Sequence, residues 1–89
     1  MNFVYILTNK RKTTLYIGVT ANLQERLAQH KKGLIKGFTK RYNVQNLIYF
    51  EEFANIEKAI LREKEIKAWS RLKKTQLIAS MNPTWTELE

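Results

Sequence analysis

The chain has 89 residues, with 16 Lys plus Arg against 8 Asp plus Glu and a formal net charge of +8. This length has room for one domain but not for a second, and a hydrophobic content of 44 % supplies enough apolar material for a packed core. The sequence contains no cysteine, which excludes disulfides, thiolate zinc sites and thiol nucleophiles. No apolar run approaches the roughly 18 residues that a membrane span requires, so we expect a cytoplasmic protein without a membrane segment.

The positive charge is concentrated in the first part of the sequence. Residues 1–40 contain one acid, Glu25, whereas bases and acids nearly balance in residues 41–89. The bases of the first part are Lys10, Arg11, Lys12, Arg26, Lys31, Lys32, Lys36 and Lys40. A one-sided excess favours a nucleic-acid partner, because neutralising phosphates releases the counterions condensed on the polymer. A solubilising surface without a specific partner is the alternative.

Two β-rich runs open the chain. Residues 3–7 and 15–19 combine aromatic and β-branched side chains, and the polar connection between them predicts an antiparallel hairpin. Both runs are apolar on both faces, so we expect the hairpin to be covered on each side and to lie centrally in a small sheet. A helix follows, with Asn22 as its N-cap, Glu25 closing a capping box and Gly33 as its stop signal.

The second half continues with one more strand and two helices. Residues 34–44 mix glycine, basic and aromatic residues without a period, which predicts an irregular exposed loop, and residues 47–53 form a third strand. The spacing predicts a long helix over 56–69, capped by Asn55, and a short helix near 74–80 that ends before Asn82-Pro83. The order ββαβαα indicates an α+β fold in one domain, residues 1–89, with helices around a small mixed or antiparallel sheet.

Glu63 occupies a position on the stripe of the long helix where the period requires an apolar side chain. Burying a carboxylate there costs desolvation free energy unless it meets a cation, a hydrogen-bond donor or a metal ion. The alternative is that Glu63 lies at the edge of the stripe and pairs with Lys67, four residues later. Periodicity alone leaves both interpretations open.

Arg26 and His30 lie four residues apart in the first predicted helix and therefore project from one face. A guanidinium that forks to phosphate oxygens beside an imidazole is suited to binding a phosphoester; two solvated side chains beside the core are the alternative. Tyr5 and Tyr16 lie near the middle of the two hairpin strands, where tyrosines are usually core aromatics. Gly18 marks a bulge or a close approach to the backbone.

Together these residues form a known pattern. Val4-Tyr5-Ile6 followed by Tyr16-Ile17-Gly18 resembles the paired motif of the GIY-YIG nuclease superfamily, although the glycine before the first tyrosine is missing. The resemblance continues through Thr20, Asn22, Arg26 and His30, then Arg62-Glu63-Lys64 and Asn82-Pro83, and so covers essentially the whole chain. The chain is most similar to the small single-domain UPF0213 type, related to the catalytic domain of structure-specific Slx1-type endonucleases.

This resemblance implies a three-stranded antiparallel sheet flanked by helices and the metal-dependent hydrolysis of DNA phosphodiester bonds, in DNA repair or recombination. It implies that Glu63 is the single carboxylate that holds one Mg²⁺ or Mn²⁺ and that Arg26 clamps the phosphate. Tyr5 and Tyr16 would orient or deprotonate the attacking water, His30 would assist them, and Asn82 would lie at the rim of the site. The general base stays open between Tyr5, Tyr16 and His30, because the pKa of a free tyrosine is about 10.

Further bases are expected to contact the backbone of the nucleic acid. These are Lys10, Arg11 and Lys12 in the hairpin connection and Lys36, Lys40 and Arg41 in the irregular loop, with Asn82 added from the resemblance. DNA is the expected polymer, and branched DNA or RNA are the alternatives. Because these 89 residues contain no cysteine-rich zinc module like that of Slx1-type enzymes, we expect low specificity or specificity that comes from a protein partner. A non-catalytic nucleic-acid-binding module and a protein-interaction domain are the competing hypotheses.

Overall fold

The computed structural model of the chain describes residues 1–35 and 37–88. Its sheet contains β1 (Asn2–Thr8), β2 (Leu15–Thr20) and β3 (Asn46–Phe53) in the order β2-β1-β3, and both pairings are antiparallel. The predicted α+β class and three-stranded antiparallel sheet are therefore confirmed. Lys36, one of the predicted phosphate contacts, lies outside the described residues.

The hairpin is central in only one of its two strands. β1 pairs on both sides, whereas β2 is an edge strand, so the expectation that both strands lie centrally was wrong for β2. The apolar faces of β2 are nevertheless covered, because Leu15, Ile17 and Val19 pack into one hydrophobic cluster and Tyr16 packs against another. Burial of both faces of a strand does not require partners at both edges.

In the described residues, four helices accompany the sheet: α1 (Leu23–Lys31), α2 (Phe38–Arg41), α3 (Ile56–Lys67) and α4 (Arg71–Met81). The side chains of Asn22, Asn55 and Ser70 cap α1, α3 and α4 by accepting backbone N–H bonds. The Ser70 cap explains why the last helix begins at Arg71, earlier than predicted. The predicted capping box is not formed, since the backbone N–H of Asn22 donates to Thr20 Oγ1.

The prediction of an irregular exposed loop over residues 34–44 was wrong in part. A single helical turn, α2, begins after Gly37, whose φ of 98° lies in the region that favours glycine. Thr39 and Val44 are buried, at 4 % and 0 % exposure. One turn of helix is too short to show a period, so the sequence pattern could not reveal it.

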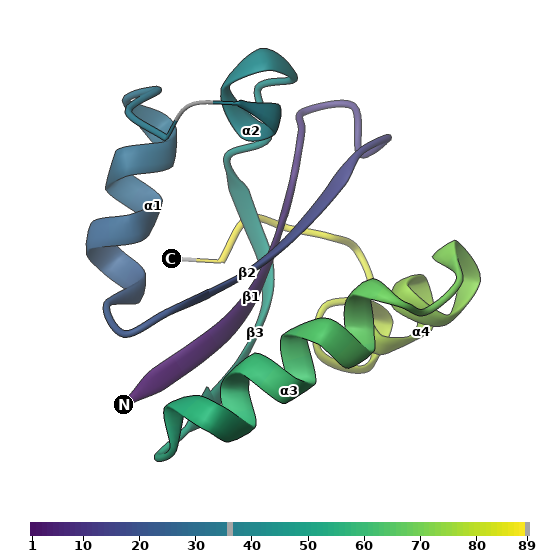
Figure 1. The fold of residues 1–89 in the computed structure, drawn as a ribbon. Coiled ribbons are helices and arrows are strands. Elements are labelled where there is room, and N and C mark those ends of the chain that lie inside the picture. Colours follow the sequence, from purple (N-terminus) through teal and green to yellow (C-terminus); the bar gives the residue numbers. More distant parts are fainter. Residues whose placement is uncertain (36, 89) are drawn as a thin grey trace.

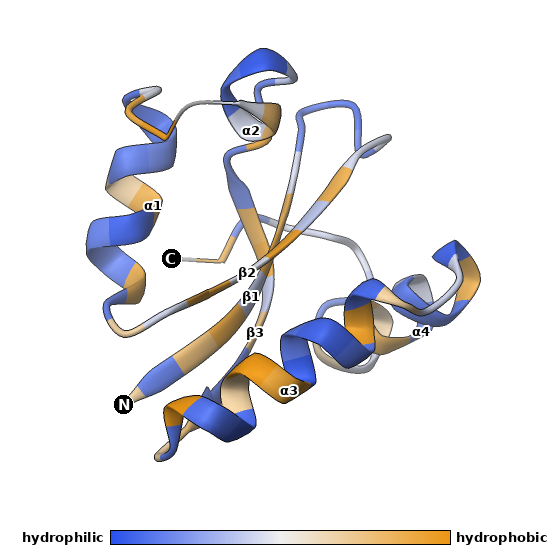
Figure 2. Cartoon of the chain, in the orientation of Figure 1, coloured by the Kyte–Doolittle hydropathy of each residue, from blue (hydrophilic) through white to orange (hydrophobic). Residues whose placement is uncertain are grey.

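The helices cover both faces of the sheet (Figure 1), with α1 on one side and α3 and α4 on the other. Apolar residues follow the three strands, while α1 is largely hydrophilic and α3 and α4 mix apolar with hydrophilic residues (Figure 2). The cluster on the α3 and α4 side consists of Val4, Ile6, Ile17, Ile48, Tyr49, Ala59, Ile66 and Ile78. The cluster on the α1 side is built on Tyr5, Leu7, Val44 and Leu47, with Leu23 and Leu27 packed against it.

Several polar segments meet at one end of the sheet. The register pairs Thr8 with both Leu15 and Asn46, so the β1–β2 loop and the approach from α2 into β3 lie at the same end. α1 runs back along the sheet toward this end (Figure 1). None of the helices in the described part of the chain has the length and apolar character needed to cross a membrane.

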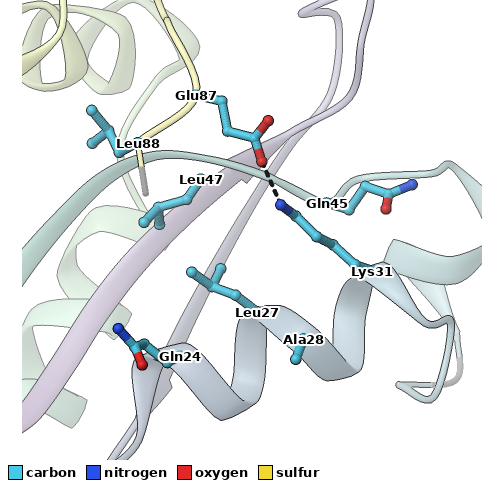
Figure 3. Close-up of a pocket in the computed structure, with 8 residues that line it drawn as sticks. All are labelled: Gln24, Leu27, Ala28, Lys31, Gln45, Leu47, Glu87 and Leu88. Atoms are coloured by element: carbon cyan, nitrogen blue, oxygen red, sulfur yellow. Dashed lines mark ion pairs between the residues drawn. The ribbon is translucent and has the colours of Figure 1, made fainter.

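The segment after α4 wraps around the β3 edge. Trp85 packs with the cluster on the α3 and α4 side, whereas Leu88 packs with the cluster on the α1 side. The backbone N–H of Leu88 donates to the carbonyl of Leu47 at 2.7 Å. Beside it, Glu87 forms an ion pair with Lys31 of α1 at 2.8 Å (Figure 3). The C-terminal segment thereby joins the two layers of the fold.

Candidate active site on the α1 face of the sheet

A chain of hydrogen bonds connects Tyr5 to α2. The Tyr5 hydroxyl lies 3.1 Å from His30 Nε2, and His30 Nδ1 lies 3.1 Å from Thr39 Oγ1. All three side chains are buried. A neutral imidazole donates through one nitrogen and accepts through the other, so both ring nitrogens of His30 are satisfied in the uncharged form.

Tyr5 reaches His30 by lying across the backbone of the neighbouring strand. Tyr5 pairs with Gly18 in the β1–β2 register, and a Cβ added at Gly18 would lie 2.5 Å from both Cζ and the hydroxyl of Tyr5. Tyr16, two residues before Gly18, stands on the same face of β2. Its ring centroid lies 6.2 Å from that of Tyr5 and 5.6 Å from that of His30. Gly18 therefore serves a close approach, as one of its two sequence interpretations predicted.

Arg26 supplies the positive charge of this cluster. It lies one turn before His30 on α1, which the Asn22 cap anchors at the end of β2. Burial lowers the pKa of His30, and the charge of Arg26 lowers it further. Burial also raises the pKa of Tyr5, with contributions from Tyr16 and Glu63, while Arg26 opposes the increase. Arg26 and Glu63 are thus both close enough to act electrostatically on Tyr5.

Glu63 approaches this cluster from α3. Its side chain is 14 % exposed and forms an ion pair with Lys67 Nζ at 2.9 Å. The sequence offered burial at a functional site and pairing with Lys67 as alternatives, and the structure combines them: Glu63 is largely buried, acts on Tyr5 and pairs with Lys67. Lys67 is 51 % exposed, so its long side chain can turn away when another cation approaches.

The neighbour of Glu63 fixes α3 to the sheet. Arg62 donates from Nε to Glu51 Oε1 at 2.9 Å and from Nη2 to Glu51 Oε2 at 3.0 Å. Burial alone would raise the pKa of Glu51, but the hydrogen bonds from Arg62 and Tyr49 hold it below its usual value. A forked pair of this kind sets the rotation of the helix, and therefore the direction of Glu63.

The donor set is compatible with one hard cation. In the described residues, no three His, Cys, Asp or Glu side chains gather into a metal-binding cluster. Mg²⁺ keeps several of its waters and is commonly held by one or two carboxylates plus substrate phosphates. Glu63, with hydroxyl groups nearby and no thiolate in the chain, fits Mg²⁺ or Mn²⁺ better than a metal that requires a complete protein cage.

The other predicted contacts are found in two environments. Lys10, Arg11 and Lys12 lie exposed in the β1–β2 loop, and Lys40 and Arg41 lie exposed on α2, at the same end of the sheet. Lys40 also lines a cleft of about 270 Å³ between α1 and α2, together with His30 and Lys32. The exposed basic residues of the β1–β2 loop face the solvent, although Lys12 Nζ donates to the carbonyl of Thr84 at 3.2 Å, and Lys40 already lies near His30.

Asn82 differs from these bases because it is buried. It is 6 % exposed, donates from Nδ2 to the carbonyls of Ile48 and Thr86, and accepts at Oδ1 from the Thr86 N–H. Every polar atom of its side chain is used to hold the C-terminal segment against β3. The geometry gives Asn82 a structural task and leaves it no free group at a rim.

A second hollow contains none of the predicted catalytic residues. It has a volume of about 270 Å³ and lies between α1 and the C-terminal segment, where Leu27, Leu47 and Leu88 point into it (Figure 3). Its lining combines these leucines with the Lys31–Glu87 ion pair, and it belongs to the junction between the two layers. The chemistry-bearing side chains converge instead on Tyr5.

Two residues of the cluster escaped the sequence analysis. Thr39 holds His30, but a threonine in a segment without periodicity gives no signal. Glu51 fixes Arg62, and its position in a predicted strand did not indicate a partner eleven residues away.

Comparison with known proteins places this arrangement in a family. The family model described as the GIY-YIG catalytic domain matches residues 1–76, which include Tyr5, Tyr16, Arg26, His30 and Glu63. The chain belongs to the GIY-YIG catalytic-domain family. The resemblance first suggested by the spaced tyrosines is therefore confirmed.

Similar GIY-YIG chains extend over almost the same length. A UPF0213 protein of Clostridium perfringens is 42 % identical over 80 residues, which span 90 % of this chain and 85 % of the relative. A UPF0213 protein of Natronomonas pharaonis is 37 % identical over 78 residues, spanning 88 % of this chain and 91 % of the relative. The solution NMR structure of a UPF0213 protein from Bacillus halodurans is 31 % identical, covers 96 % of this chain and 90 % of its own, and superposes with a TM-score of 0.61.

Proposed function

We propose that this GIY-YIG domain is an endonuclease that hydrolyses phosphodiester bonds of DNA with one Mg²⁺ or Mn²⁺ held at Glu63. Membership of a nuclease-type family gives the reaction class. The observation that carries the proposal is the buried hydrogen-bond chain from Tyr5 through His30 to Thr39, with Arg26 on the helix of His30 and the largely buried Glu63 on α3 both near enough to act electrostatically on Tyr5. An arginine to bind phosphate and a carboxylate to bind a cation, both directed at one hydroxyl cluster, suit phosphoester hydrolysis.

Each side chain has a task in this proposal. Arg26 would bind the non-bridging phosphate oxygens and stabilise the charge that develops on them. Tyr16 is only partly buried, so its hydroxyl is the one that orients the attacking water. A cation held at Glu63 would add positive charge beside the phosphate. Lys67 would leave Glu63 when that cation binds.

Tyr5 and His30 are better suited to holding the site than to removing a proton. The raised pKa keeps Tyr5 protonated at neutral pH, and its 1 % exposure keeps bulk water away. The lowered pKa of His30 keeps the imidazole neutral, so that it fits between Tyr5 and Thr39. Of the three candidates for the general base, Tyr16 is therefore the one that we propose, acting on a water whose acidity the nearby cations increase.

Cleavage of supercoiled plasmid and of branched DNA with Mg²⁺ or Mn²⁺ tests the proposal. We expect Glu63→Gln and Arg26→Ala to lower the rate on the order of 10²- to 10³-fold, as for the loss of a group that stabilises transition-state charge. Glu57→Gln is the matched control, because Glu57 is an exposed carboxylate on the same helix, and we expect it to retain the wild-type rate. Cleavage by Glu63→Gln at the wild-type rate would refute the role of Glu63.

Binding of the cation has its own measurement. Mn²⁺ broadens the NMR signals of nuclei close to it, and we expect broadening centred on Glu63 and Tyr16 in the wild type and its loss in Glu63→Gln. Broadening that persists in this variant would move the cation elsewhere.

One contact favours a second candidate function. The Glu63–Lys67 pair neutralises the carboxylate internally, which suits a domain that binds nucleic acid without cleaving it. That function predicts salt-dependent binding that Mg²⁺ does not change, with no cleavage of any substrate.

A further inference from the structure

The short helix α2 exposes two aromatic side chains that the core does not use. Phe38 and Tyr42 are each 47 % exposed, and neither belongs to the two hydrophobic clusters of the fold. They lie four residues apart, on one side of the helical turn, with their ring centroids 4.9 Å apart. Exposed aromatic surface costs free energy that burial would recover. A pair of exposed rings outside the core is therefore a candidate binding site for another flat or apolar group.

The positive charges around these rings indicate what kind of ligand they would bind. The guanidinium carbon of Arg41 lies 5.6 Å from the centroid of the Tyr42 ring. In the sequence, every ionised residue between Glu25 and Glu51 is basic, so the chain around α2 contributes no carboxylate that would repel an anion. Aromatic rings beside cations favour nucleobases attached to phosphates, since every base has a π-face and the backbone supplies the negative charge.

The position of α2 relates the rings to the site. Thr39, the residue after Phe38, bonds His30, which in turn bonds Tyr5. The helical turn that presents the rings is therefore held by the same hydrogen-bond chain that orders the Tyr5 cluster. A strand whose phosphate reaches Arg26 can place a nearby base on α2.

From this arrangement we propose that the pair Phe38 and Tyr42 forms a stacking platform for an unpaired nucleobase of the DNA substrate. The inference rests on the proposed function and narrows its substrate to DNA that contains unpaired bases. A base inside a duplex has both faces covered by its neighbours, so only a base at a fork, flap, gap or single strand can lie on these rings. A fully paired duplex would contact the basic side chains around the platform but not the two aromatic rings themselves.

Binding without divalent ions tests this inference separately from cleavage. Fluorescence anisotropy with single-stranded, forked and fully paired DNA, in the presence of EDTA, gives the affinity of each form. We expect Phe38→Ala and Tyr42→Ala each to weaken binding of single-stranded and forked DNA on the order of 10-fold, with less than about twofold change for paired DNA. 2-Aminopurine in the unpaired strand should lose fluorescence on binding to the wild type, because stacking quenches it, but not on binding to Phe38→Ala.

Two controls separate stacking from other effects. Leu61→Ala removes a side chain that is 67 % exposed on α3 and should leave every affinity unchanged. Tyr42→Phe keeps the ring and should retain the quenching. Equal losses for paired and unpaired DNA in Phe38→Ala would overturn the inference, as would wild-type self-association in sedimentation that Phe38→Ala abolishes, because the rings would then join two copies of this chain. Stacking without any cleavage would refute the proposed nuclease activity but support the stacking platform. Cleavage without a binding preference for unpaired DNA would support the nuclease activity but refute the platform.

Discussion

Tyr5 keeps its place because the residue beside it has no side chain. Its ring is 1 % exposed and lies against Tyr16 and His30, so it cannot move aside when a methyl group is added at Gly18. We expect Gly18→Ala to lower the free energy of unfolding by about 1–3 kcal/mol, the usual cost of overpacking. Urea denaturation measures this loss. The displaced Tyr5 hydroxyl should also leave His30, and cleavage should fall with it.

A double variant identifies the cause of this destabilisation. Tyr5→Leu removes the ring that the new methyl group would meet, so Gly18→Ala should cost much less in the Tyr5→Leu background than in the wild type. If the two free-energy losses simply add, the clash between Gly18 and Tyr5 is not the reason for the glycine.

His30 makes the stability of the fold depend on pH. Burial and the charge of Arg26 lower its pKa in the folded state below the value of about 6.5 expected in the unfolded chain. The unfolded state therefore binds the extra proton more readily. The stabilisation is fully present above about pH 6.5 and is lost as the pH falls from there through the lower folded-state pKa. Urea unfolding between pH 7.5 and pH 5 should show this decline.

His30→Gln provides the comparison, because His30 is the only histidine of the chain. Its free energy of unfolding should be lower at pH 7.5 and nearly flat between pH 7.5 and pH 5. An unchanged slope in His30→Gln would assign the pH dependence to other groups.

At the scale of residues, spacing singled out candidate side chains for the chemistry but did not show how they are held. The four-residue interval placed Arg26 and His30 on one helix face. Glu63 was noticed because it interrupts an apolar stripe. The bond between His30 and Thr39 joins residues from two elements, and no periodicity relates them. Asn82 shows the opposite limit: the family resemblance placed it at the rim of the site, while the tertiary fold buries it among backbone groups.

Among the elements, the C-terminal segment is held to the sheet through Asn82. Removing this side chain leaves the Ile48 carbonyl and the Thr86 N–H without their partners. We expect Asn82→Ala to lower the free energy of unfolding by about 1–3 kcal/mol, the cost of unsatisfied polar groups, and thermal or urea denaturation measures it. Thr84→Ala, in an exposed position of the same segment, should change stability much less.

The same variant also decides between two roles for Asn82. If Asn82 contacts nucleic acid, as the resemblance implies, Asn82→Ala should weaken DNA binding while the unfolding transition stays in place. A shifted transition with unchanged DNA affinity of the folded chain supports the structural role.

The elements themselves were predicted according to their length. The strands and the helices α1, α3 and α4 are long enough to show a period or a cap in the sequence. They were predicted within a few residues of their observed bounds. α2 consists of four residues, so its existence depends on contacts that bury Thr39 and Val44. The edge position of β2 was also beyond the sequence, because alternation reports which faces are buried and not which edges are paired.

At the scale of the whole molecule, the topology gathers the basic residues of the first part of the sequence at one end of the sheet. The β1–β2 loop, the end of α1 and α2 carry most of the basic residues of the first forty and lie at one end of the sheet. Two carboxylates on the other elements, Glu51 of β3 and Glu63 of α3, are engaged by Arg62 and Lys67. The net charge of +8 therefore acts mostly from one end, which would orient an approaching polyanion before it reaches Arg26.

The central position of β1 has a consequence for the order in which the molecule loosens. A strand bonded on both sides opens only when the sheet itself separates, whereas helices packed against it can fluctuate separately. Tyr5 thus stands on the most persistent part of the fold, while Arg26 and Glu63 stand on parts that move first. On warming, the helices that carry Arg26 and Glu63 should move away from Tyr5 before the sheet opens. The backbone amide of Tyr5 should be among the last to exchange its hydrogen with the solvent.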